Sequence, residues 1–476
     1  MNLRDVMGEG AADVEITGLA YDSRSVTEGT LFFCVTGLSQ DGHRFAAEAV
    51  ERGAGALVVE RPLELGVPEV RVESARAAMA PAAAAFHGDP TAELDVVGIT
   101  GTNGKTTTAF LVRALLEAAG RRCGLMGTVT SVIGGTERAV VRTTPEAIDL
   151  QRDFRAMVEA GDSACAMEVS SHALALHRCD AIHWAAAVFT NLTQDHLDFH
   201  PTMEDYFTAK RRLFEGDDPP RTAIVNVDDP YGQRLAAELG QAVTFAIDAP
   251  ADYRATDVRT GLSGARFTLR TPDRELALAS PLPGRFNVAN VIAAVAAARA
   301  LGAGHEAIAA AVEDSGRVPG RFEPVEEGQD FAVLVDYAHT PDSLENVLRA
   351  ARDLTRGRVV CVFGCGGDRD RGKRPVMGEI ATRLADAVVV TSDNPRSEDP
   401  EAIIAQIIAG ARHDAEVVLD RRTAIARAIE LAGTGDVVVI AGKGHEQGQE
   451  LAGGRREPFD DVAVAREALR GAVVGR

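Results

Sequence analysis

The sequence predicts an α/β fold divided into three domains. Short apolar runs typical of buried strands alternate along the chain with longer runs of helical spacing. At 476 residues the chain exceeds what one hydrophobic core holds, and about 150 residues per domain gives three domains. The pattern breaks at His87–Pro90 and at Arg317–Arg321, so we place the domains at residues 1–92, 93–318 and 319–476.

Each predicted domain has its own strands and helices. The first, a small α/β domain, has strand candidates at 31–35 and 56–59 and a helix candidate at 45–53. The central domain predicts a parallel sheet covered by helices, with strand candidates at 164–169, 185–189, 223–227 and 243–247. Within it, residues 265–269 and 275–278 alternate like an antiparallel meander before an alanine-rich helix at 288–301. The third domain predicts a Rossmann-like, doubly wound fold with strands at 332–335, 359–363, 387–391 and 437–441.

Bulk composition excludes several classes of protein. Hydrophobic content of 46% and charged content of 25% are those of a globular protein, and no apolar stretch reaches the ~20 residues that span a bilayer. The charged start Met1–Val6 differs from a signal peptide. A net charge of −20 argues against a nucleic-acid surface. We expect a cytoplasmic monomer whose partners are small molecules, with neither nucleic acid nor membrane among them.

Two further features of composition bear on chemistry. The six cysteines are scattered, without a C-x-x-C pair or zinc-type spacing, which predicts buried reduced thiols. The basic cluster Arg369–Arg374 stands out against an acidic background. Such a local cluster is typical of a site for small anions.

Residues 98–108 form the most informative stretch of the sequence. They lie between an apolar run and a helical run, so they predict a strand, a glycine loop and a helix start. Gly101 and Gly104 let backbone N–H groups converge on an anion at the helix N-terminus. Lys105 would reach the outer phosphates and the Thr106 hydroxyl could ligate Mg²⁺. The loop therefore predicts a nucleoside triphosphate site in a central P-loop ATPase domain.

This loop departs from the general P-loop spacing G-x-x-x-x-G-K-[ST], which would place a glycine at position 99, where the chain has Ile99. The alternative is an ordinary strand-to-helix turn closed by glycines.

Other polar residues follow strands of the central domain. Glu168 ends a strand, where ligands of open α/β sheets bind, and could hold a metal. The cluster Asn191–His200 is either a metal site or a hydrogen-bonded loop. Its place beside the nucleotide-binding strand favours Mg²⁺ that bridges phosphates with few protein ligands. Lys210, by its surroundings alone, reads as a solvated helix lysine.

Three strand ends of the third domain carry charged motifs. Residues 364–369 superficially suggest a dinucleotide fingerprint but lack the full G-x-G-x-x-G. Asp393–Arg396 and Gly442–Glu446 follow two other strands. Together they would present Arg369, Arg396 and Glu446 to one crevice, a set that suits a ligand with a carboxylate and an ammonium group. The alternative is a set of surface turns with ordinary salt bridges.

Taken together, these motifs resemble the Mur ligase family over essentially the whole chain. The motifs are Gly101–Thr107, Glu168–His172, Asn191–His200, Gly284–Asn290, Pro319–Glu323, Asp336–Asp342, Asp393–Arg396 and Gly442–Glu446. The Asp393–Arg396 tetrapeptide resembles the branch that adds meso-diaminopimelate, because lysine-adding relatives generally lack this arginine.

The resemblance implies an ATP-dependent, Mg²⁺-requiring amide ligase of peptidoglycan precursor synthesis. It would join meso-diaminopimelate to the D-glutamate γ-carboxylate of UDP-N-acetylmuramoyl-L-alanyl-D-glutamate through an acyl phosphate. The alternatives are a lysine-adding Mur ligase and a ligase like folylpolyglutamate synthase. A nucleotide-dependent oxidoreductase and a non-enzymatic ATP-binding switch explain fewer of the motifs.

The resemblance also assigns residues to each ligand. The expected ATP-binding residues are Gly101, Thr102, Asn103, Gly104, Lys105, Thr106, Thr107, Asn287, Asn290, Arg321, Asp336 and His339. The expected catalytic residues are Lys105, Glu168, His196 and Lys210, and the expected metal ligands are Thr106, Glu168, His196 and Lys210. Lys210 matches a lysine that the family carbamylates, which would turn a cation into a carboxylate facing Mg²⁺.

The two other substrates have their own expected residues. Those for the UDP-linked acceptor are Ser23, Leu38, Ser39 and Gln40 at the uridine nucleotide, and Thr143, Thr144, Ser170 and Arg178 along the muramoyl-dipeptide. Those for diaminopimelate are Arg369, Asp393, Asn394, Pro395, Arg396, Gly442 and Glu446. The chain has Leu176 where relatives often carry a glutamine two residues before the arginine. One polar contact to the acceptor is therefore missing from the expected set.

Overall fold

The computed structural model describes residues 1–37 and 40–474, which form two compact units. One unit comprises Met1–Thr100, Ala119–Val188 and Thr208–Ala223. The other comprises Gly101–Ala118, Phe189–Phe207 and the chain from Ile224 onward. In the described ranges no helix combines the length and the apolar character needed to cross a membrane. The domain boundaries at residues 92 and 318 stay a prediction.

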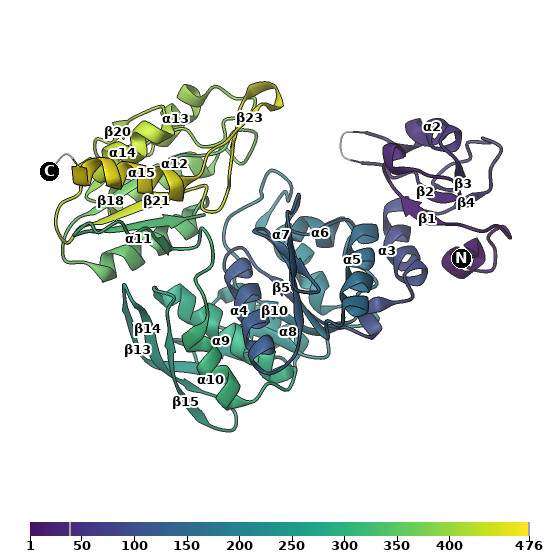
Figure 1. The fold of residues 1–476 in the computed structure, drawn as a ribbon, viewed down its shortest axis with the longest axis horizontal. Coiled ribbons are helices and arrows are strands. Elements are labelled where there is room, and N and C mark those ends of the chain that lie inside the picture. Colours follow the sequence, from purple (N-terminus) through teal and green to yellow (C-terminus); the bar gives the residue numbers. More distant parts are fainter. Residues whose placement is uncertain (38–39, 475–476) are drawn as a thin grey trace. The chain divides into compact units, whose positions relative to one another are not determined.

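The N-terminal part of the first unit is a small parallel sheet with helices on both faces (Figure 1). Its strands, in the order β1-β2-β3-β4, are β1 (Gly18–Ala20), β2 (Thr30–Phe33), β3 (Ala54–Val59) and β4 (Glu69–Arg71). Its helices are α1 (Leu3–Met7), α2 (Ala46–Glu51) and α3 (Ala75–Phe86). Leu31 and Phe33 pack with α1 and α3, whereas Phe32 packs with α2, because successive side chains of a strand point to opposite faces.

The rest of the first unit is built on a larger sheet. Its strand order is β10-β5-β9-β6-β7-β8. The strands are β5 (Asp95–Thr100), β6 (Cys123–Met126), β7 (Ser131–Ile133), β8 (Thr136–Arg138), β9 (Ala164–Glu168) and β10 (Trp184–Phe189), and the helices are α5 (Ala147–Ala160) and α6 (Ser171–Ala175). Strand β9 pairs in parallel with β5 and β6, so these strands end at the same edge. The antiparallel turn-back β6-β7-β8 was not predicted.

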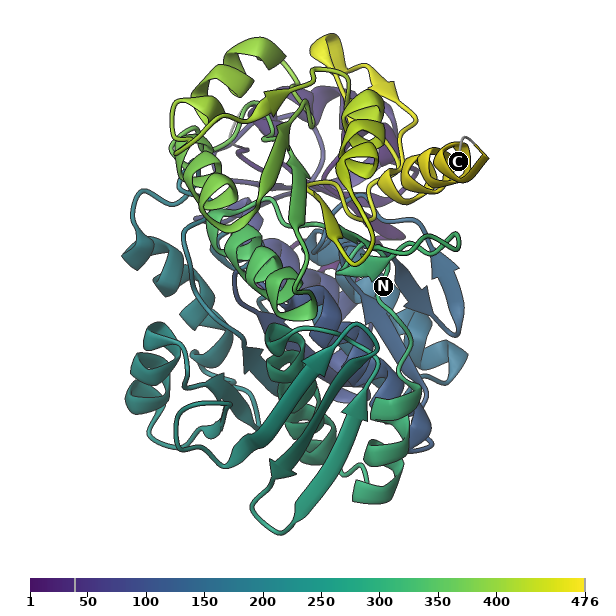
Figure 2. The same cartoon turned by 90° about the vertical axis from the view of Figure 1, so that its left-hand side faces the viewer.

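The second unit begins with the helix that follows the glycine loop. Its helices before residue 320 are α4 (Lys105–Ala118), α8 (Pro230–Leu239), α9 (Arg285–Ala300) and α10 (His305–Asp314), and α7 (Met203–Arg211) has residues in both units. Its first strands are β11 (Ala223–Asn226), β12 (Val243–Ala246), β13 (Tyr253–Gly261), β14 (Gly264–Arg270) and β15 (Glu275–Ser280). Strands β13, β14 and β15 pair antiparallel, which confirms the predicted meander (Figure 2).

The C-terminal part of the second unit is a six-stranded sheet in the order β16-β17-β21-β18-β19-β20. The strands are β16 (Glu323–Pro324), β17 (Ala332–Asp336), β18 (Val359–Phe363), β19 (Ala387–Val390), β20 (Glu416–Val417) and β21 (Val437–Ala441). The helices are α11 (Pro341–Leu354), α12 (Lys373–Leu384), α13 (Pro400–Ile408), α14 (Arg421–Leu431) and α15 (Asp461–Val474). A short hairpin of β22 (Gln449–Glu450) and β23 (Arg456–Glu457) follows β21.

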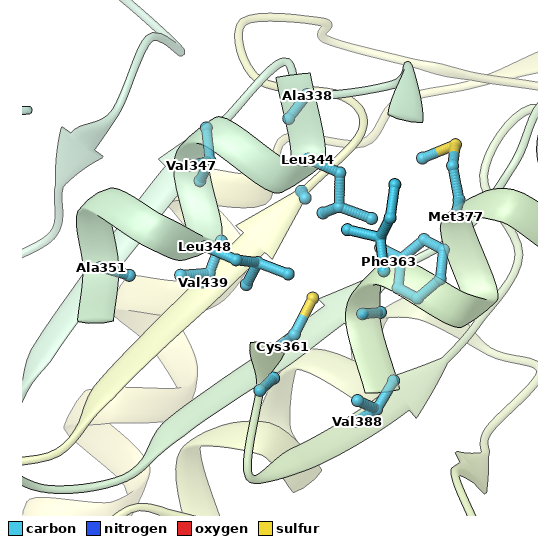
Figure 3. Packing of buried hydrophobic residues seen from close by; sticks show 14 of the residues in the cluster. Ala338, Leu344, Val347, Leu348, Ala351, Cys361, Phe363, Met377, Val388 and Val439 are labelled. Carbon is cyan, nitrogen blue, oxygen red and sulfur yellow. The ribbon is translucent and has the colours of Figure 1, made fainter. Parts of the chain in front are cut away.

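Helices cover both faces of this sheet. Cys361, Phe363 and Val439 pack against α11 and α12, as Figure 3 shows. Val360 and Val438, one residue along, pack on the other face against α14 and α15. Figure 1 shows α11 and the pair α14 and α15 on opposite sides of β18 and β21. The predicted doubly wound fold is therefore confirmed, and with it the α/β class.

Parallel pairing sets where the site of this sheet lies. Strands β17, β18, β19 and β21 run parallel and end at Asp336, Phe363, Val390 and Ala441. Each of the charged motifs predicted for this domain begins at or just after one of these ends. The motifs therefore share one edge, the usual ligand edge of a doubly wound sheet.

The cysteines match their prediction. All six are free thiols and buried: Cys34, Cys123, Cys165, Cys179, Cys361 and Cys365. Burial raises the pKa of Cys361 to about 12, so this thiol stays protonated and acts as a small apolar side chain.

Candidate functional site

The loop between β5 and α4 depends on two glycines with positive φ. Gly101 has φ +146° and Gly104 has φ +87°. A Cβ added to Gly101 would lie 1.9 Å from Thr190 Oγ1, and one added to Gly104 would lie 2.4 Å from Asn290 Oδ1. Only glycine fits at these two positions, because a side chain would collide and would also strain the backbone.

Residues 190–193 hold this loop in shape. The Thr102 N–H donates to the Asn191 carbonyl at 2.9 Å, and the Asn103 N–H donates to Asn191 Oδ1 at 2.9 Å. The Thr193 N–H donates to Thr102 Oγ1 at 3.0 Å. The first half of the Asn191–His200 motif therefore holds the glycine loop in shape. For these residues the structure agrees with the hydrogen-bonded loop, one of the two alternatives for this motif.

The ammonium of Lys105 lies over the same loop. Its Nζ donates to the carbonyl of Gly101 at 2.9 Å and to that of Thr102 at 2.8 Å. The first turn of α4 begins at this residue, so its N–H groups and the positive end of the helix dipole point to the loop. This cradle fits a chain of phosphates.

Two asparagines of α9 complete the wall of the loop. Asn287 and Asn290 lie one turn apart and share a hydrogen bond of 3.1 Å from Asn290 Nδ2 to Asn287 Oδ1. Thr108 Oγ1 of α4 donates to Asn290 Oδ1 at 3.5 Å. The structure thus brings both predicted asparagines to the glycine loop.

The C-terminal part of the chain also reaches this loop. Arg321 Nη2 donates to Thr106 Oγ1 at 2.8 Å, and its guanidinium stacks over the Tyr337 ring at 4.6 Å from the ring centroid. Asn103 Nδ2 donates to Asp342 Oδ2 at 2.6 Å. A capping box between Thr340 and the first turn of α11 fixes the position of Asp342.

Two ionisable residues, one at the end of β17 and one just after it, have shifted pKa values. Burial raises the pKa of Asp336 to about 6, although Asp336 accepts a hydrogen bond of 2.6 Å from the Phe322 N–H. Burial and the charge of Lys373 lower the pKa of His339 to about 4. His339 is therefore a neutral imidazole near pH 7.

Asp195 links the two predicted histidines. Its Oδ2 lies 3.3 Å from His196 Nε2 and 4.0 Å from His339 Nε2. Burial raises the pKa of Asp195, but electrostatic interactions with His196, His339 and Lys373 outweigh burial and bring the pKa down to about 2. His196 itself has φ +55°, which turns the chain sharply at this point.

The expected metal ligands are divided between the units. Thr106 and His196 belong to the second unit and Glu168 and Lys210 to the first. Across residues 1–37 and 40–474, no three His, Cys, Asp or Glu side chains gather to hold a metal ion. Apart from Lys210, the expected ligands offer the hydroxyl of Thr106, the carboxylate of Glu168 and the imidazole of His196. The two oxygen donors suit Mg²⁺, which keeps few protein ligands beside phosphate.

Lys210 and Glu168 are both buried. Lys210 is 1% exposed, so its interpretation as a solvated helix lysine is wrong. Glu168, also 1% exposed, accepts hydrogen bonds from the Thr128 N–H at 2.7 Å and from Thr128 Oγ1 at 3.0 Å.

The residues expected to bind the acceptor dipeptide form one hydrogen-bonded group at the end of β9. Thr143 Oγ1 lies 3.0 Å from Thr128 Oγ1, and Thr144 Oγ1 donates to the Glu168 carbonyl at 2.9 Å. The Ser170 N–H donates to Thr144 Oγ1 at 3.1 Å. Ser170 also caps α6, which fixes its hydroxyl at the strand end.

Arg178 joins a buried carboxylate that sequence analysis missed. Its Nη2 lies 2.9 Å from Glu146 Oε1, and its Nη1 donates to the Thr144 carbonyl at 3.2 Å. Arg76 and Arg142 also contact Glu146, at 3.2 Å and 3.0 Å. Three guanidinium groups therefore share one carboxylate, which leaves an excess of positive charge beside the group at the end of β9.

Two of the four residues expected at the uridine nucleotide, Ser23 and Gln40, lie within the described part of the chain. Ser23 is buried and its Oγ donates to Glu48 Oε2 at 3.1 Å, while Gln40 is exposed. Leu38 and Ser39 lie outside the described residues. After this loop, His43 Nδ1 lies 2.6 Å from Asp41 Oδ1, and His43 Nε2 accepts the Glu60 N–H at 3.0 Å.

A buried charged cluster lies at the ends of β19 and β21. Lys443 Nζ lies 2.7 Å from Asn394 Oδ1, 3.2 Å from Glu446 Oε2 and 3.3 Å from Asp393 Oδ1. Burial raises the pKa of Asp393, but the charges of Lys443 and Arg421 outweigh it and lower the pKa overall. The predicted residues Asp393, Asn394 and Glu446 are thus together. The sequence motif contained Lys443, but it was not singled out.

Arg396 lies at the rim of this cluster with φ +50°. Its Nε lies 2.7 Å from Glu450 Oε2, and its Nη1 donates to the Gly367 carbonyl at 2.9 Å. Arg369 is exposed and donates to the Asp368 carbonyl at 2.9 Å. The remaining expected residues of this site are Pro395, whose carbonyl faces Gly367, and Gly442, with φ +122°.

Lysine usage gives a signal that sequence analysis did not use. The chain has four lysines, Lys105, Lys210, Lys373 and Lys443, and every other Lys or Arg position is arginine. Lys373 is 5% exposed and acts electrostatically on Asp195 and His339. These four positions therefore stand out in a chain whose other Lys and Arg side chains are all guanidinium groups.

Three protein-family models match the chain. The model for the Mur ligase family catalytic domain matches residues 15–87, and the model for the Mur ligase middle domain matches residues 99–298. The model for the glutamate ligase domain of Mur ligases matches residues 320–444.

Individual relatives match over nearly their whole length. A protein of Syntrophomonas wolfei subsp. wolfei is 47% identical, with 99% of this chain and 98% of the relative covered. A protein of Geobacillus thermodenitrificans is 49% identical, with coverages of 96% and 95%. Both bear the name UDP-N-acetylmuramoyl-L-alanyl-D-glutamate--2,6-diaminopimelate ligase.

Solved structures of ligases are also similar to this chain. A structure of a ligase of the same name is 34% identical, covers 99% of each chain and has a TM-score of 0.70. Folylpolyglutamate synthase of Mycobacterium tuberculosis, complexed with ADP and AMPPCP, has a TM-score of 0.64 at 19% identity and covers 84% of this chain and 95% of its own. At that identity the second likeness shows the fold alone.

Proposed function

Because the chain belongs to the Mur ligase family, we propose that it is an ATP-dependent ligase that joins meso-diaminopimelate to UDP-N-acetylmuramoyl-L-alanyl-D-glutamate. The new amide forms at the γ-carboxylate of the D-glutamate. The observation that carries the proposal is the pairing, in one unit, of a phosphate cradle with a buried cluster of both charges, Asp393, Lys443 and Glu446.

The glycine loop and its neighbours bind the triphosphate of ATP in this proposal. The N–H groups of residues 101–107 and the start of α4 supply positive potential, and Lys105 moves from the loop carbonyls to the outer phosphates. The wall of the site is formed by Asn287, Asn290, Arg321, Asp336 and His339. The contacts of Arg321 and Asp342 with the loop tie the C-terminal part to it, as closure of the site requires.

Mg²⁺ would be held by the Thr106 hydroxyl, Glu168, His196 and, once carbamylated, Lys210. The ion supplies charge neutralisation between two anions that otherwise repel. Carbamylation would give Lys210, which is 1% exposed, a carboxylate in place of an ammonium, and a carboxylate is a group that can face Mg²⁺.

The acceptor would lie along the group at the end of β9. Thr143, Thr144 and Ser170 offer hydroxyls and N–H groups, and Arg178 offers a guanidinium. Arg76 and Arg142, which pair with Glu146, add positive charge beside this group. Ser23 and the loop that contains Gln40 would hold the uridine nucleotide.

The chemistry begins by activating a carboxylate that resists attack. The γ-carboxylate oxygen attacks the γ-phosphorus of ATP, the bond to the β-phosphate oxygen breaks, and an acyl phosphate and ADP form. Lys105 and the loop N–H groups offset the charge of the transferred group. The neutral amine of diaminopimelate then attacks the acyl carbon, loses a proton and expels phosphate, which leaves the amide.

Selection of the amino acid would lie at the C-terminal cluster. Asp393, Asn394 and Glu446 suit an ammonium, and Arg396 suits the second carboxylate that distinguishes diaminopimelate from lysine. A site built around such a polar group rejects an analogue that lacks it by about 10⁴-fold. A lysine-adding ligase would have no use for Arg396, and a ligase like folylpolyglutamate synthase would leave the Asp393–Arg396 turn unexplained.

The test is ligation with a panel of amino acids. The purified chain with ATP, Mg²⁺ and the muramoyl-dipeptide acceptor should release phosphate and form a tripeptide product with meso-diaminopimelate, and far less with lysine, ornithine or glutamate. The variant Lys105→Ala should form no product with any of them. Lysine as the best substrate would favour the lysine-adding alternative, and phosphate release without any acceptor would favour an ATP-binding switch.

A further inference from the structure

Arg396 already has a carboxylate partner within its own chain. The ion pair from Arg396 Nε to Glu450 Oε2 is 2.7 Å long. Arg396 Nη1 donates to the Gly367 carbonyl at 2.9 Å. Among the described residues no further hydrogen bond reaches this side chain, so Nη2 is the edge that remains for a ligand.

The backbone fixes Glu450 at this place. The Glu450 N–H donates to Asn394 Oδ1 at 3.0 Å, and the Arg396 N–H donates to the Glu450 carbonyl at 3.2 Å. Beside it, Gln449 Nε2 donates to the Asp393 carbonyl at 2.6 Å. The β22–β23 hairpin is therefore bonded to the same turn that carries Arg396, so the backbone of Glu450 is held beside Arg396.

We propose that Glu450 is a specificity-determining residue that stands in for the second carboxylate of the incoming amino acid on Arg396. This inference rests on the proposed function, in which Arg396 reads that carboxylate. Glu450 has two effects in this role. It neutralises Arg396 when the amino acid brings no second carboxylate, and it repels that carboxylate when the amino acid brings one.

Both effects reduce the difference in binding affinity between diaminopimelate and lysine. Without Glu450, bound lysine would leave the Arg396 guanidinium, which is 24% exposed, without an anion. With Glu450, the cost of that mismatch falls. The side chain of Glu450 is 49% exposed, so solvent screens the pair, and we expect its charge to change discrimination by about fivefold.

The variant Glu450→Gln separates this role from a structural one. Glutamine keeps nearly the same shape beside Arg396 Nε but has no charge. The matched control is Glu457→Gln, because Glu457 lies on the same hairpin opposite Gln449 and pairs with Arg455 at 3.1 Å instead of Arg396. Both variants remove one negative charge from the hairpin.

The measurement is phosphate release with meso-diaminopimelate as substrate and L-lysine as competitor, on the full chain with ATP, Mg²⁺ and the acceptor. In Glu450→Gln the KM for diaminopimelate should fall, the Ki for lysine should rise, and the ratio of Ki to KM should increase about fivefold. The KM for ATP should not change. In Glu457→Gln all three constants should equal those of the parent chain.

Two results would overturn the inference in different ways. If Glu450→Gln leaves the ratio unchanged, or raises both constants by one factor, while Arg396→Met still impairs diaminopimelate use, Glu450 is structural and the proposed function stands. If Arg396→Met leaves diaminopimelate kinetics unchanged, the inference falls together with the proposed role of Arg396.

Discussion

Arg321 donates a hydrogen bond of 2.8 Å to the hydroxyl of Thr106, although the two residues are 215 positions apart in the chain. Thr106 lies in the first turn of α4, and Arg321 precedes β16 of the C-terminal sheet. The bond connects the glycine loop to the part of the chain that carries the amino-acid cluster. It places a guanidinium beside the predicted phosphates.

Replacing this guanidinium should weaken ATP use. In Arg321→Met we expect kcat/KM for ATP to fall by about 10²-fold, the size of effect typical of losing one charged contact to a transferring phosphate. Steady-state kinetics with varied ATP would measure it. The control is Arg317→Met, four residues earlier, where an exposed arginine faces Glu326 at 3.8 Å. An equal loss in both variants would contradict a specific role for Arg321.

The modification of Lys210 can be observed without an activity assay. We expect the chain, equilibrated with ¹³C-bicarbonate, to show one carbamate carbon by NMR, because Lys210 is 1% exposed and matches the lysine that the family carbamylates. With four lysines in the chain, assignment is direct. The signal should vanish in Lys210→Arg and persist in Lys443→Arg. A signal that survives Lys210→Arg would refute the assignment.

The buried pair Arg421 and Asp461 should matter for stability. Arg421 Nη2 lies 2.7 Å from Asp461 Oδ2, and neither side chain is exposed. Arg421→Met would leave Asp461 buried without a cation, which should lower the free energy of unfolding by about 3 kcal/mol. Denaturant unfolding would measure it. Arg422→Met removes the neighbouring arginine, whose partner Glu467 is exposed, and should cost much less.

The pKa of His339 gives a prediction about pH. The folded pKa, about 4, lies below the ordinary value of 6.5, so the neutral imidazole is the form that the fold favours. Its contribution to stability is therefore complete above pH 6.5 and is lost as the pH falls through about 4. Lys373→Met should raise this pKa, because one repelling cation is removed. Histidine NMR titration would show the rise, and a fall or no change would contradict the account.

Sequence patterns predicted the buried parts of the fold well. The strands at 359–363 and 437–441 have the predicted bounds, because strands buried on both faces read as unbroken apolar runs. The turn-back through β8 was missed, since all three residues of Thr136–Arg138 are exposed and carry no apolar alternation. Local pattern also misjudged Lys210, whose burial depends on tertiary packing.

In the candidate site, too, local features were predictable from the sequence and long-range contacts were not. Residues within one motif, such as Gly101 and Lys105, were predictable because loop, helix start and side chain are local. Pairs that join distant segments were not, as Arg76 with Glu146 and Arg396 with Glu450 show. Their partners lie on other elements, and a carboxylate on a short hairpin has no pattern of its own.

The central claim is that one triphosphate, bound at the glycine loop, converts the γ-carboxylate of the acceptor into an acyl phosphate. The most direct measurement uses acceptor labelled with ¹⁸O in that carboxylate, followed by mass analysis of the released phosphate. The account predicts that each phosphate carries one ¹⁸O atom and that Lys105→Ala releases none. Phosphate without ¹⁸O would mean that water, and not the carboxylate, accepts the phosphoryl group, and would contradict the account.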